Sequence, residues 1–194
     1  MYGRRFDPLL LGEDMKAKKS VSVALSGIIS ALSIVTMFLT AVLPVVSLSL
    51  CAVAGMFLAV IIIEFGYRYA LSSYLVTLAL AGLFVADKDS VLLFALCFGL
   101  YPIVKSLMER IGEKVLQWTA KLAFFNGVMI VYYFLATLVL LLPADEFQIA
   151  GQSVPLLILL FGNVVFVFYD VAFSRLISFY RYRLQENLRK RLGL

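Results

Sequence analysis

Six long apolar runs, separated by short polar stretches, constrain this chain more than any other feature. They lie at about 20–43, 45–63, 69–86, 91–107, 122–142 and 154–180. Each is within or close to the ~17–25 residues that a helix needs to cross the hydrocarbon core of a bilayer. Backbone polar groups in lipid must be paired inside the protein, which favours helices. The sequence therefore predicts an all-α polytopic membrane protein, a bundle of six transmembrane helices.

The basic residues are distributed unevenly around these runs. When the N-terminus is taken as cytoplasmic, all but one of the 17 lysines and arginines fall on the cytoplasmic side. The exception is Lys88. Basic residues in short loops resist translocation and so orient membrane helices. The bias predicts a multi-pass protein of the plasma or inner membrane, with both termini in the cytoplasm.

The composition leaves no room for a separate soluble domain. Hydrophobic residues make up 63% of the 194 residues and charged residues only 15%, far from the values of soluble domains. We expect a polar, basic N-terminal segment (1–19), a transmembrane domain (20–180) and a basic C-terminal tail (181–194). Between the fourth and fifth runs, Leu107, Ile111, Val115 and Trp118 share one helical face. That pattern predicts an amphipathic segment on the inner membrane surface.

Several classes of function are disfavoured. The chain has no histidine, the commonest general base and metal ligand, and its two cysteines lie far apart inside apolar runs. No paired acids or Ser-Lys dyad share a face. We therefore expect no catalytic residues, no metal and no cofactor, and we predict that the chain is not an enzyme. Nucleic acid is not an expected partner either, because no basic patch alternates with aromatic residues.

The first apolar run has two faces of small residues. Serine and threonine side chains at positions 22, 26, 30, 33 and 40 share one side of the predicted helix, and Ala24, Gly27 and Ala31 lie roughly opposite. Small residues let helix backbones approach closely in a membrane. Two interpretations follow. The helix is central in its own bundle, or the face of Ala24, Gly27 and Ala31 docks a helix of another subunit.

The last apolar run carries a polar stripe of Asn163, Asp170 and Ser174. An ionised carboxylate is costly in lipid, so we expect Asp170 to face inward or to lie near the inner interface, paired with Arg175. Asn163 and Asp170 both suit a role in helix packing. A role in a binding site fits Asn163 better, because it lies nearer the middle of the bilayer.

A short outer loop holds Lys88 between Asp87 and Asp89. The loop is either a solvated turn or the cap of an outward-facing pocket, where it would supply charge to a small ligand. The candidate substrate-binding residues are therefore Asp87, Lys88, Asp89 and Asn163. Tyr101-Pro102 in the fourth run is expected to kink or loosen that helix, because proline removes a backbone hydrogen bond.

Three stretches carry a resemblance to a known family. Ala24-Leu-Ser-Gly27-Ile-Ile-Ser-Ala31-Leu-Ser33 has a small-xxx-small pattern. It is accompanied by Phe98-Gly-Leu-Tyr-Pro-Ile-Val-Lys105 and by the segment from Gly162-Asn163 to Tyr169-Asp170. Together with six spans and two inner termini, these stretches resemble the substrate-binding S components of energy-coupling factor (ECF) transporters. The small-xxx-small stretch is similar to the one by which S components meet their coupling subunit.

The resemblance implies an importer subunit for a vitamin or similar micronutrient. Such a subunit binds its small-molecule substrate from outside, and it docks in the membrane lipid on a transmembrane coupling subunit driven by two ATPase subunits. This chain has no glycine-rich phosphate loop ending in Lys-Ser/Thr, so ATP hydrolysis would belong to the partners. The lack of histidine departs from the nickel- and cobalt-type members. The alternative is a non-transport membrane scaffold or accessory protein, which would work through the amphipathic segment and the basic tail.

Overall fold

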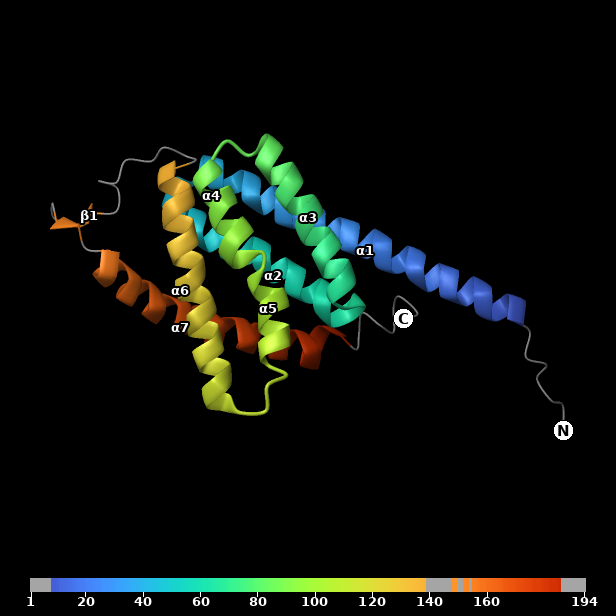
Figure 1. Cartoon of the computed structure of the whole chain (residues 1–194). Helices are drawn as coiled ribbons and strands as arrows, with labels where there is room; N and C mark the ends of the chain where they lie inside the picture. Colours follow the sequence, from blue (N-terminus) through green and yellow to red (C-terminus); the bar gives the residue numbers. More distant parts are fainter. Residues whose placement is uncertain (1–7, 139–147, 150–151, 154, 186–194) are drawn as a thin grey trace.

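Helices dominate the computed structural model, which describes residues 8–138, 148–149, 152–153 and 155–185 (Figure 1). The helices are α1 (Pro8–Val42), α2 (Ser47–Phe65), α3 (Tyr67–Phe84), α4 (Lys88–Leu93), α5 (Tyr101–Met108), α6 (Lys114–Leu138) and α7 (Pro155–Phe179), with η1 (Pro44–Val46), η2 (Phe94–Phe98) and η4 (Tyr180–Gln185) as 3₁₀ or π segments. Two strands of two residues, β1 (Gln148–Ile149) and β2 (Gln152–Ser153), pair antiparallel with Gln148 opposite Ser153. The predicted all-α bundle is confirmed.

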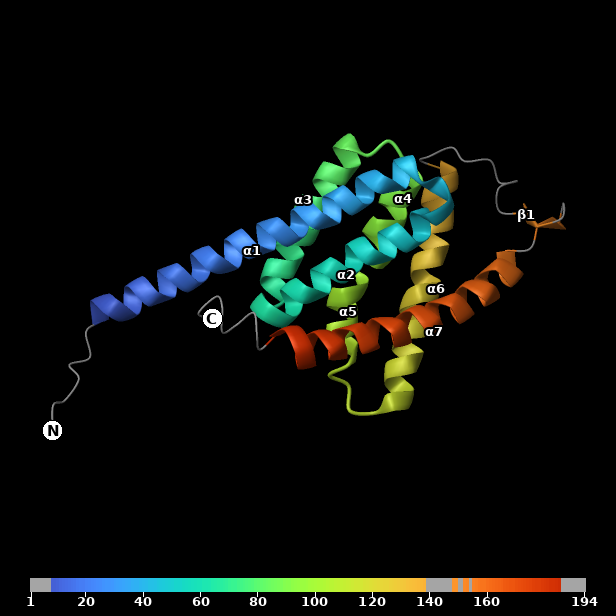
Figure 2. The same cartoon turned by 180° about the vertical axis from the view of Figure 1, so that it is seen from behind.

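Each predicted span corresponds to one helical segment, and α4, η2 and α5 together form the fourth. Five segments of the described chain are long and apolar enough to cross a membrane: Lys19–Val42, Pro44–Phe65, Lys88–Met108, Lys114–Leu138 and Leu159–Arg183. The remaining helix, α3, has 18 residues and is less apolar because Arg68 and two tyrosines occupy its first turn. It packs beside α1 and α2 (Figure 2).

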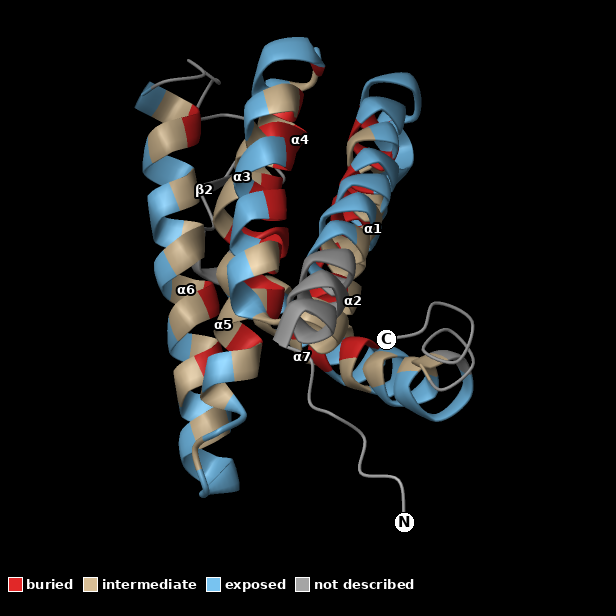
Figure 3. Cartoon of the chain, turned by 90° about the vertical axis from the view of Figure 1, so that its right-hand side faces the viewer, coloured by how far each residue is buried: buried red, intermediate tan, exposed pale blue. Residues whose placement is uncertain are grey.

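The surface of the bundle is apolar on every long helix. Large side chains such as Val42, Phe84, Phe134, Phe161 and Phe168 are exposed. Buried positions follow narrow stripes that face neighbouring helices, and exposed positions cover the outward faces (Figure 3). An apolar surface of this extent requires a covering, and lipid provides one. The chain is a multi-pass membrane protein.

Helix α1 is longer than the first apolar run. Its 35 residues begin at Pro8, so Pro8–Lys19 of the predicted polar segment continues the membrane helix. At ~1.5 Å per residue the helix is ~50 Å long, and its first turns extend past the other helices (Figure 1). The remainder packs along α2 and α3.

The fourth span is interrupted where the sequence predicts it. The π-helical segment η2 ends with the amide of Gly99 donating to the carbonyl of Phe94, 2.8 Å away. Pro102 follows in the first turn of α5 and has no N–H for the carbonyl of Phe98 four residues earlier. Helix α2 packs closely against this opening at Gly55. A Cβ added at Gly55 would lie 2.2 Å from the Phe98 oxygen.

The predicted amphipathic segment is a turn followed by the start of α6, and it does not form a separate helix. Helix α5 ends at Met108, the chain turns over residues 109–113, and α6 begins at Lys114. The side-chain amide of Gln117 closes this turn by donating to the carbonyl of Ile111, 2.5 Å away. Leu107 belongs to α5, and Val115 and Trp118 belong to α6; all three are exposed.

Candidate functional site

Three ionisable side chains are buried where α5, α6 and α7 meet. Lys105, Lys121 and Asp170 are 1%, 5% and 2% exposed, respectively. Ionisable groups inside a membrane helix are costly, and they commonly mark functional sites. We call these three residues, together with Glu109, the charge cluster.

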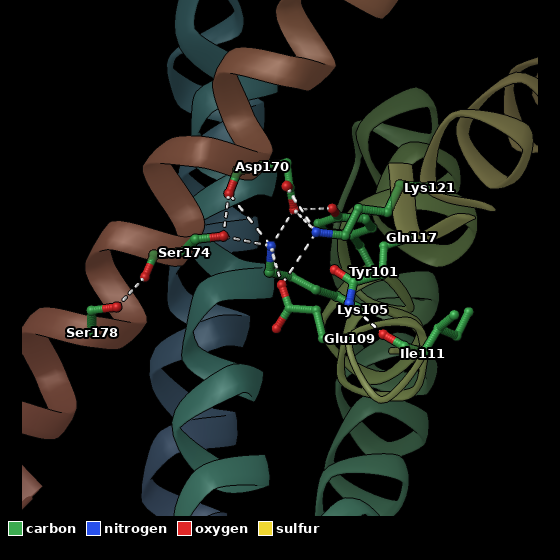
Figure 4. Close-up of polar contacts among 9 residues, drawn as sticks. All are labelled: Tyr101, Lys105, Glu109, Ile111, Gln117, Lys121, Asp170, Ser174 and Ser178. Carbon is green, nitrogen blue, oxygen red and sulfur yellow. Dashed lines mark hydrogen bonds and ion pairs between the residues drawn. The ribbon is translucent and has the colours of Figure 1, made fainter. Parts of the chain in front are cut away.

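Asp170 is the centre of the charge cluster (Figure 4). Its carboxylate accepts hydrogen bonds from the ammonium of Lys105 and from the hydroxyl of Tyr101. The Nζ of Lys121 lies 2.9 Å from its Oδ2 and 3.2 Å from its Oδ1. Ser174, one turn later on α7, receives a further N–H of Lys105 at 2.7 Å. Donors from two helices therefore hold a carboxylate on a third.

Glu109 balances the second lysine and links the charge cluster to the surface. Its Oε1 lies 3.0 Å from the Nζ of Lys105 and 3.2 Å from that of Lys121, and its side chain is 43% exposed. Two ammonium groups thus meet two carboxylates, so the charge cluster is neutral when all four groups are ionised. A neutral set loses less on burial than an unpaired charge would.

Aromatic rings enclose the buried end of the charge cluster. The fully buried ring of Tyr101 lies 5.1 Å from Phe166, 5.6 Å from Tyr169 and 6.0 Å from Phe173, between ring centroids. The ammonium of Lys105 lies 5.7 Å from the centroid of the Phe173 ring. This apolar shell keeps the local dielectric low, which strengthens each polar contact inside it.

The arrangement ties three helices together. Each ionised group of the charge cluster comes from α5, the turn after it, α6 or α7, and none can move without breaking ion pairs on another element. The two lysines of the charge cluster donate to its two carboxylates. In the described part of the chain, no three His, Cys, Asp or Glu side chains gather as a metal site requires.

The predicted pairing of Asp170 with Arg175 is wrong. Arg175 is exposed, because five residues of helix place it ~140° around α7 from Asp170. Lys105 and Lys121, which the charge bias assigns to the cytoplasmic side, both point into the bundle. A signal was available: Tyr101, Lys105 and Glu109 are spaced four apart and therefore share a helical face.

The loop residues proposed for substrate binding make contacts within the protein. Asp87 caps α4, accepting from the Ser90 amide at 3.1 Å. The ammonium of Lys88 donates to the carbonyls of Gly82 and Val85, at 2.7 and 2.9 Å, and so caps α3. Asp89 accepts from the hydroxyl of Tyr132 on α6, at 2.5 Å.

Asn163 forms a reciprocal amide pair with Asn126. The two side chains exchange hydrogen bonds of 2.9 and 3.0 Å between α7 and α6. The candidate binding residues therefore do not bond to one another. Asn163 bonds to Asn126 of α6, and the outer loop reaches α6 through Asp89 and Tyr132.

The two faces of α1 have different surroundings. Ser26, Ser30, Ser33 and Thr40 are buried, and the Ser33 hydroxyl donates to the Ala54 carbonyl of α2 at 3.0 Å. Ala24, Gly27 and Ala31 are exposed, and no atom lies within 4 Å of a Cβ added at Gly27. The serine face packs inside this bundle, and the face of Ala24, Gly27 and Ala31, here called the α1 outer face, is open.

Comparison of the chain with family models, with curated proteins and with solved structures gave no match. Its function must therefore be inferred from the charge cluster, the outer loop and the α1 outer face.

Proposed function

We propose that this chain is the substrate-binding membrane subunit of an ATP-driven importer of the ECF type, which takes up a vitamin or similar micronutrient. The observation that carries the proposal is the asymmetry of α1. Its serine face is used inside the bundle, so the smooth outer face has no packing role within the described protein. Small residues on an exposed membrane helix favour close contact with a helix of another subunit.

The expected partners are a transmembrane coupling subunit and two ATPase subunits. The chain has no phosphate-binding loop of its own, so ATP would be hydrolysed by those partners. Helix α1 suits a docking role because it lies at one side of the bundle and packs mainly on α2 and α3 (Figure 2). A second helix has lateral access to Gly27.

We place the substrate at the opposite, outer end of the bundle. The caps at Asp87 and Lys88 hold the loop in place, and the Asp89–Tyr132 hydrogen bond ties it to α6. A lysine ammonium has three N–H donors, and Lys88 uses two of them on carbonyls of α3. The third is suited to a small polar ligand. Asn163 lies deeper, on α7.

The test is a pair of matched glycine substitutions. Gly27→Leu places a large side chain on the α1 outer face, and Gly127→Leu places the same side chain on the exposed face of α6. Both glycines are helical, and a Cβ at either one meets no atom within 4 Å. Both changes also improve helix propensity, by ~1 kcal/mol. We expect both variants to fold, and only Gly27→Leu to prevent co-purification of partner subunits from the native host and to abolish uptake.

Two outcomes would contradict the proposal. If Gly27→Leu and Gly127→Leu co-purify with the same partners in equal amounts, the α1 outer face is not a docking surface. If no coupling or ATPase subunit co-purifies with the unmodified protein, a non-transport scaffold or accessory role is the better explanation.

A further inference from the structure

A cavity of about 500 Å³ lies beside the charge cluster, at the end of the bundle where the sequence places the basic loops. Its walls come from α2, the turn between α2 and α3, α5 and the turn after it, the end of α7 and the start of η4. Gly66 and Tyr67 line it between α2 and α3, Ser106 on α5, Glu109 just after α5, and Arg181 on η4. The volume is within the ~300–1,000 Å³ typical of small-molecule sites.

The lining of the cavity combines apolar residues with an excess of positive charge. Ala59, Ile62, Ile63, Pro102 and Ile177 form the apolar part. Lys105, Arg110 and Arg181 are the cations of the lining, and Glu109 is its anion. A ligand that combines apolar and anionic parts matches this lining.

The positive charge is not cancelled by the neighbouring carboxylates. Lys105 and Lys121 are paired with Asp170 and Glu109, two cations with two anions. Within the described residues, Arg110 and Arg181 take part in no ion pair. The cavity and the charge cluster together therefore hold four cations and two anions, a net charge of +2.

We propose that this cavity binds a phosphate-bearing ligand, with Arg110 and Arg181 at its phosphate. A guanidinium presents a planar fork of N–H donors that matches phosphate oxygens. Basic pockets between transmembrane helices near the cytoplasmic surface bind anionic lipid headgroups in the same way. The ligand is either the headgroup of an anionic phospholipid, whose glycerol and first acyl carbons would meet Ile62 and Ile177, or a free phosphate compound.

This site is separate from the proposed substrate site. The cavity opens at the end of the bundle that carries Arg110 and Arg181, whereas Asp87, Lys88 and Asp89 lie at the opposite end of their helices. Its occupant would contact Lys105 and Glu109, and would therefore stabilise the junction of α5, α6 and α7. The inference holds whether or not the chain is an importer subunit.

The experiment compares two double variants of equal charge. Arg110→Gln with Arg181→Gln removes the cavity arginines, and Lys114→Gln with Arg175→Gln removes two exposed cations outside the cavity. All four residues are exposed, so both variants should fold, and their melting temperatures in phosphatidylcholine nanodiscs check this. Native mass spectrometry then measures retention of phosphatidylglycerol after reconstitution with mixed lipid at about 0.5 M salt, where exposed charges are strongly screened.

We expect the cavity variant to retain phosphatidylglycerol about tenfold less than the unmodified protein, and the control variant to change less than twofold, since each basic residue at an anionic headgroup contributes ~1 kcal/mol. A second arm adds inorganic phosphate to protein in phosphatidylcholine alone. A rise in melting temperature that only the cavity variant loses, without lipid retention, would identify a free phosphate compound as the ligand. Equal behaviour of both variants in both arms, or no response of the unmodified protein to either ligand, would overturn the proposal.

Discussion

Asp170 shows why a buried charge at a single residue has consequences for three helices. Its carboxylate receives Tyr101 and Lys105 from α5 and Lys121 from α6. Replacing a whole buried ion pair with apolar residues is often tolerated, but removing one partner leaves the other charges without compensation. The charge cluster therefore favours this arrangement of α5, α6 and α7, because separating Asp170 from its partners in the buried junction would leave lysines unpaired.

Asp170→Asn is expected to destabilise the protein severely. The substitution keeps the shape of the side chain but leaves Lys105 and Lys121 with Glu109 as their only carboxylate. We expect a loss of ~3–5 kcal/mol in the free energy of unfolding, the cost of breaking a buried pair. Thermal or denaturant unfolding in detergent, followed by tryptophan fluorescence of Trp118, measures it.

Glu109→Gln is the matched control for that prediction. Glu109 contacts the same two lysines, but its side chain is 43% exposed, so water can replace it at a cost of ~1 kcal/mol or less. Equal losses for Asp170→Asn and Glu109→Gln would show that the buried carboxylate has no special role.

At the scale of elements, the broken fourth span determines how closely α2 can approach. Pro102 leaves the carbonyl of Phe98 without a helical donor, and η2 widens the backbone just before it. Gly55 of α2 fits against that carbonyl because it has no side chain. Gly99 is similarly close to the ring of Tyr74, where a Cβ would meet a carbon at 2.7 Å. Two glycines thus allow α2 and α3 to pack on the interrupted helix.

Gly55→Ala is expected to force α2 away from η2. The added Cβ would lie 2.2 Å from a backbone oxygen, which cannot move as a side chain can. Overpacking of this kind costs ~1–3 kcal/mol, which exceeds the ~1 kcal/mol that alanine gains over glycine in a helix. The free energy of unfolding in detergent should fall.

The same substitution at Gly127 provides the comparison, because a Cβ there meets no atom within 4 Å. Gly127→Ala should leave the free energy of unfolding unchanged or raise it. If Gly55→Ala is as stable as Gly127→Ala, the close approach of α2 to Phe98 does not exist in the folded protein.

At the scale of the whole molecule, the charge bias and the helix order together define a topology. The charge cluster, the cavity and the ends of α2, α5 and α7 lie toward one end of the bundle, and the loop of Asp87 to Ser90 lies toward the other. We expect the first end to face the cytoplasm, because nearly all basic residues belong to it.

Reporter fusions test this orientation. A reporter fused after Leu194 should be active only as a cytoplasmic marker, and one inserted between Pro143 and Ser153 only as an external marker. A six-span chain requires opposite readouts at these two places. The same readout at both would exclude the topology, and reversed readouts would place the cavity outside.

The sequence by itself determined the fold class, the six helical segments and the break near Pro102. These properties depend on the length and polarity of local segments, because a bilayer accepts only helices of sufficient apolar length. It also separated the two faces of α1, since helical periodicity alone places Ser30 and Ala31 on different sides.

Tertiary structure alone decided which charges meet. Lys105, Lys121 and Asp170 are separated by 16 and 49 residues along the chain, and no local pattern states which side chain of α5 or α6 lies opposite α7. Arg175 is the basic residue nearest to Asp170 in the sequence. The predicted pairing of the two was wrong, because the helix rotates Arg175 away from Asp170. The choice depends on how α5, α6 and α7 pack, and a buried carboxylate accepts only the cations that this packing brings within hydrogen-bond distance.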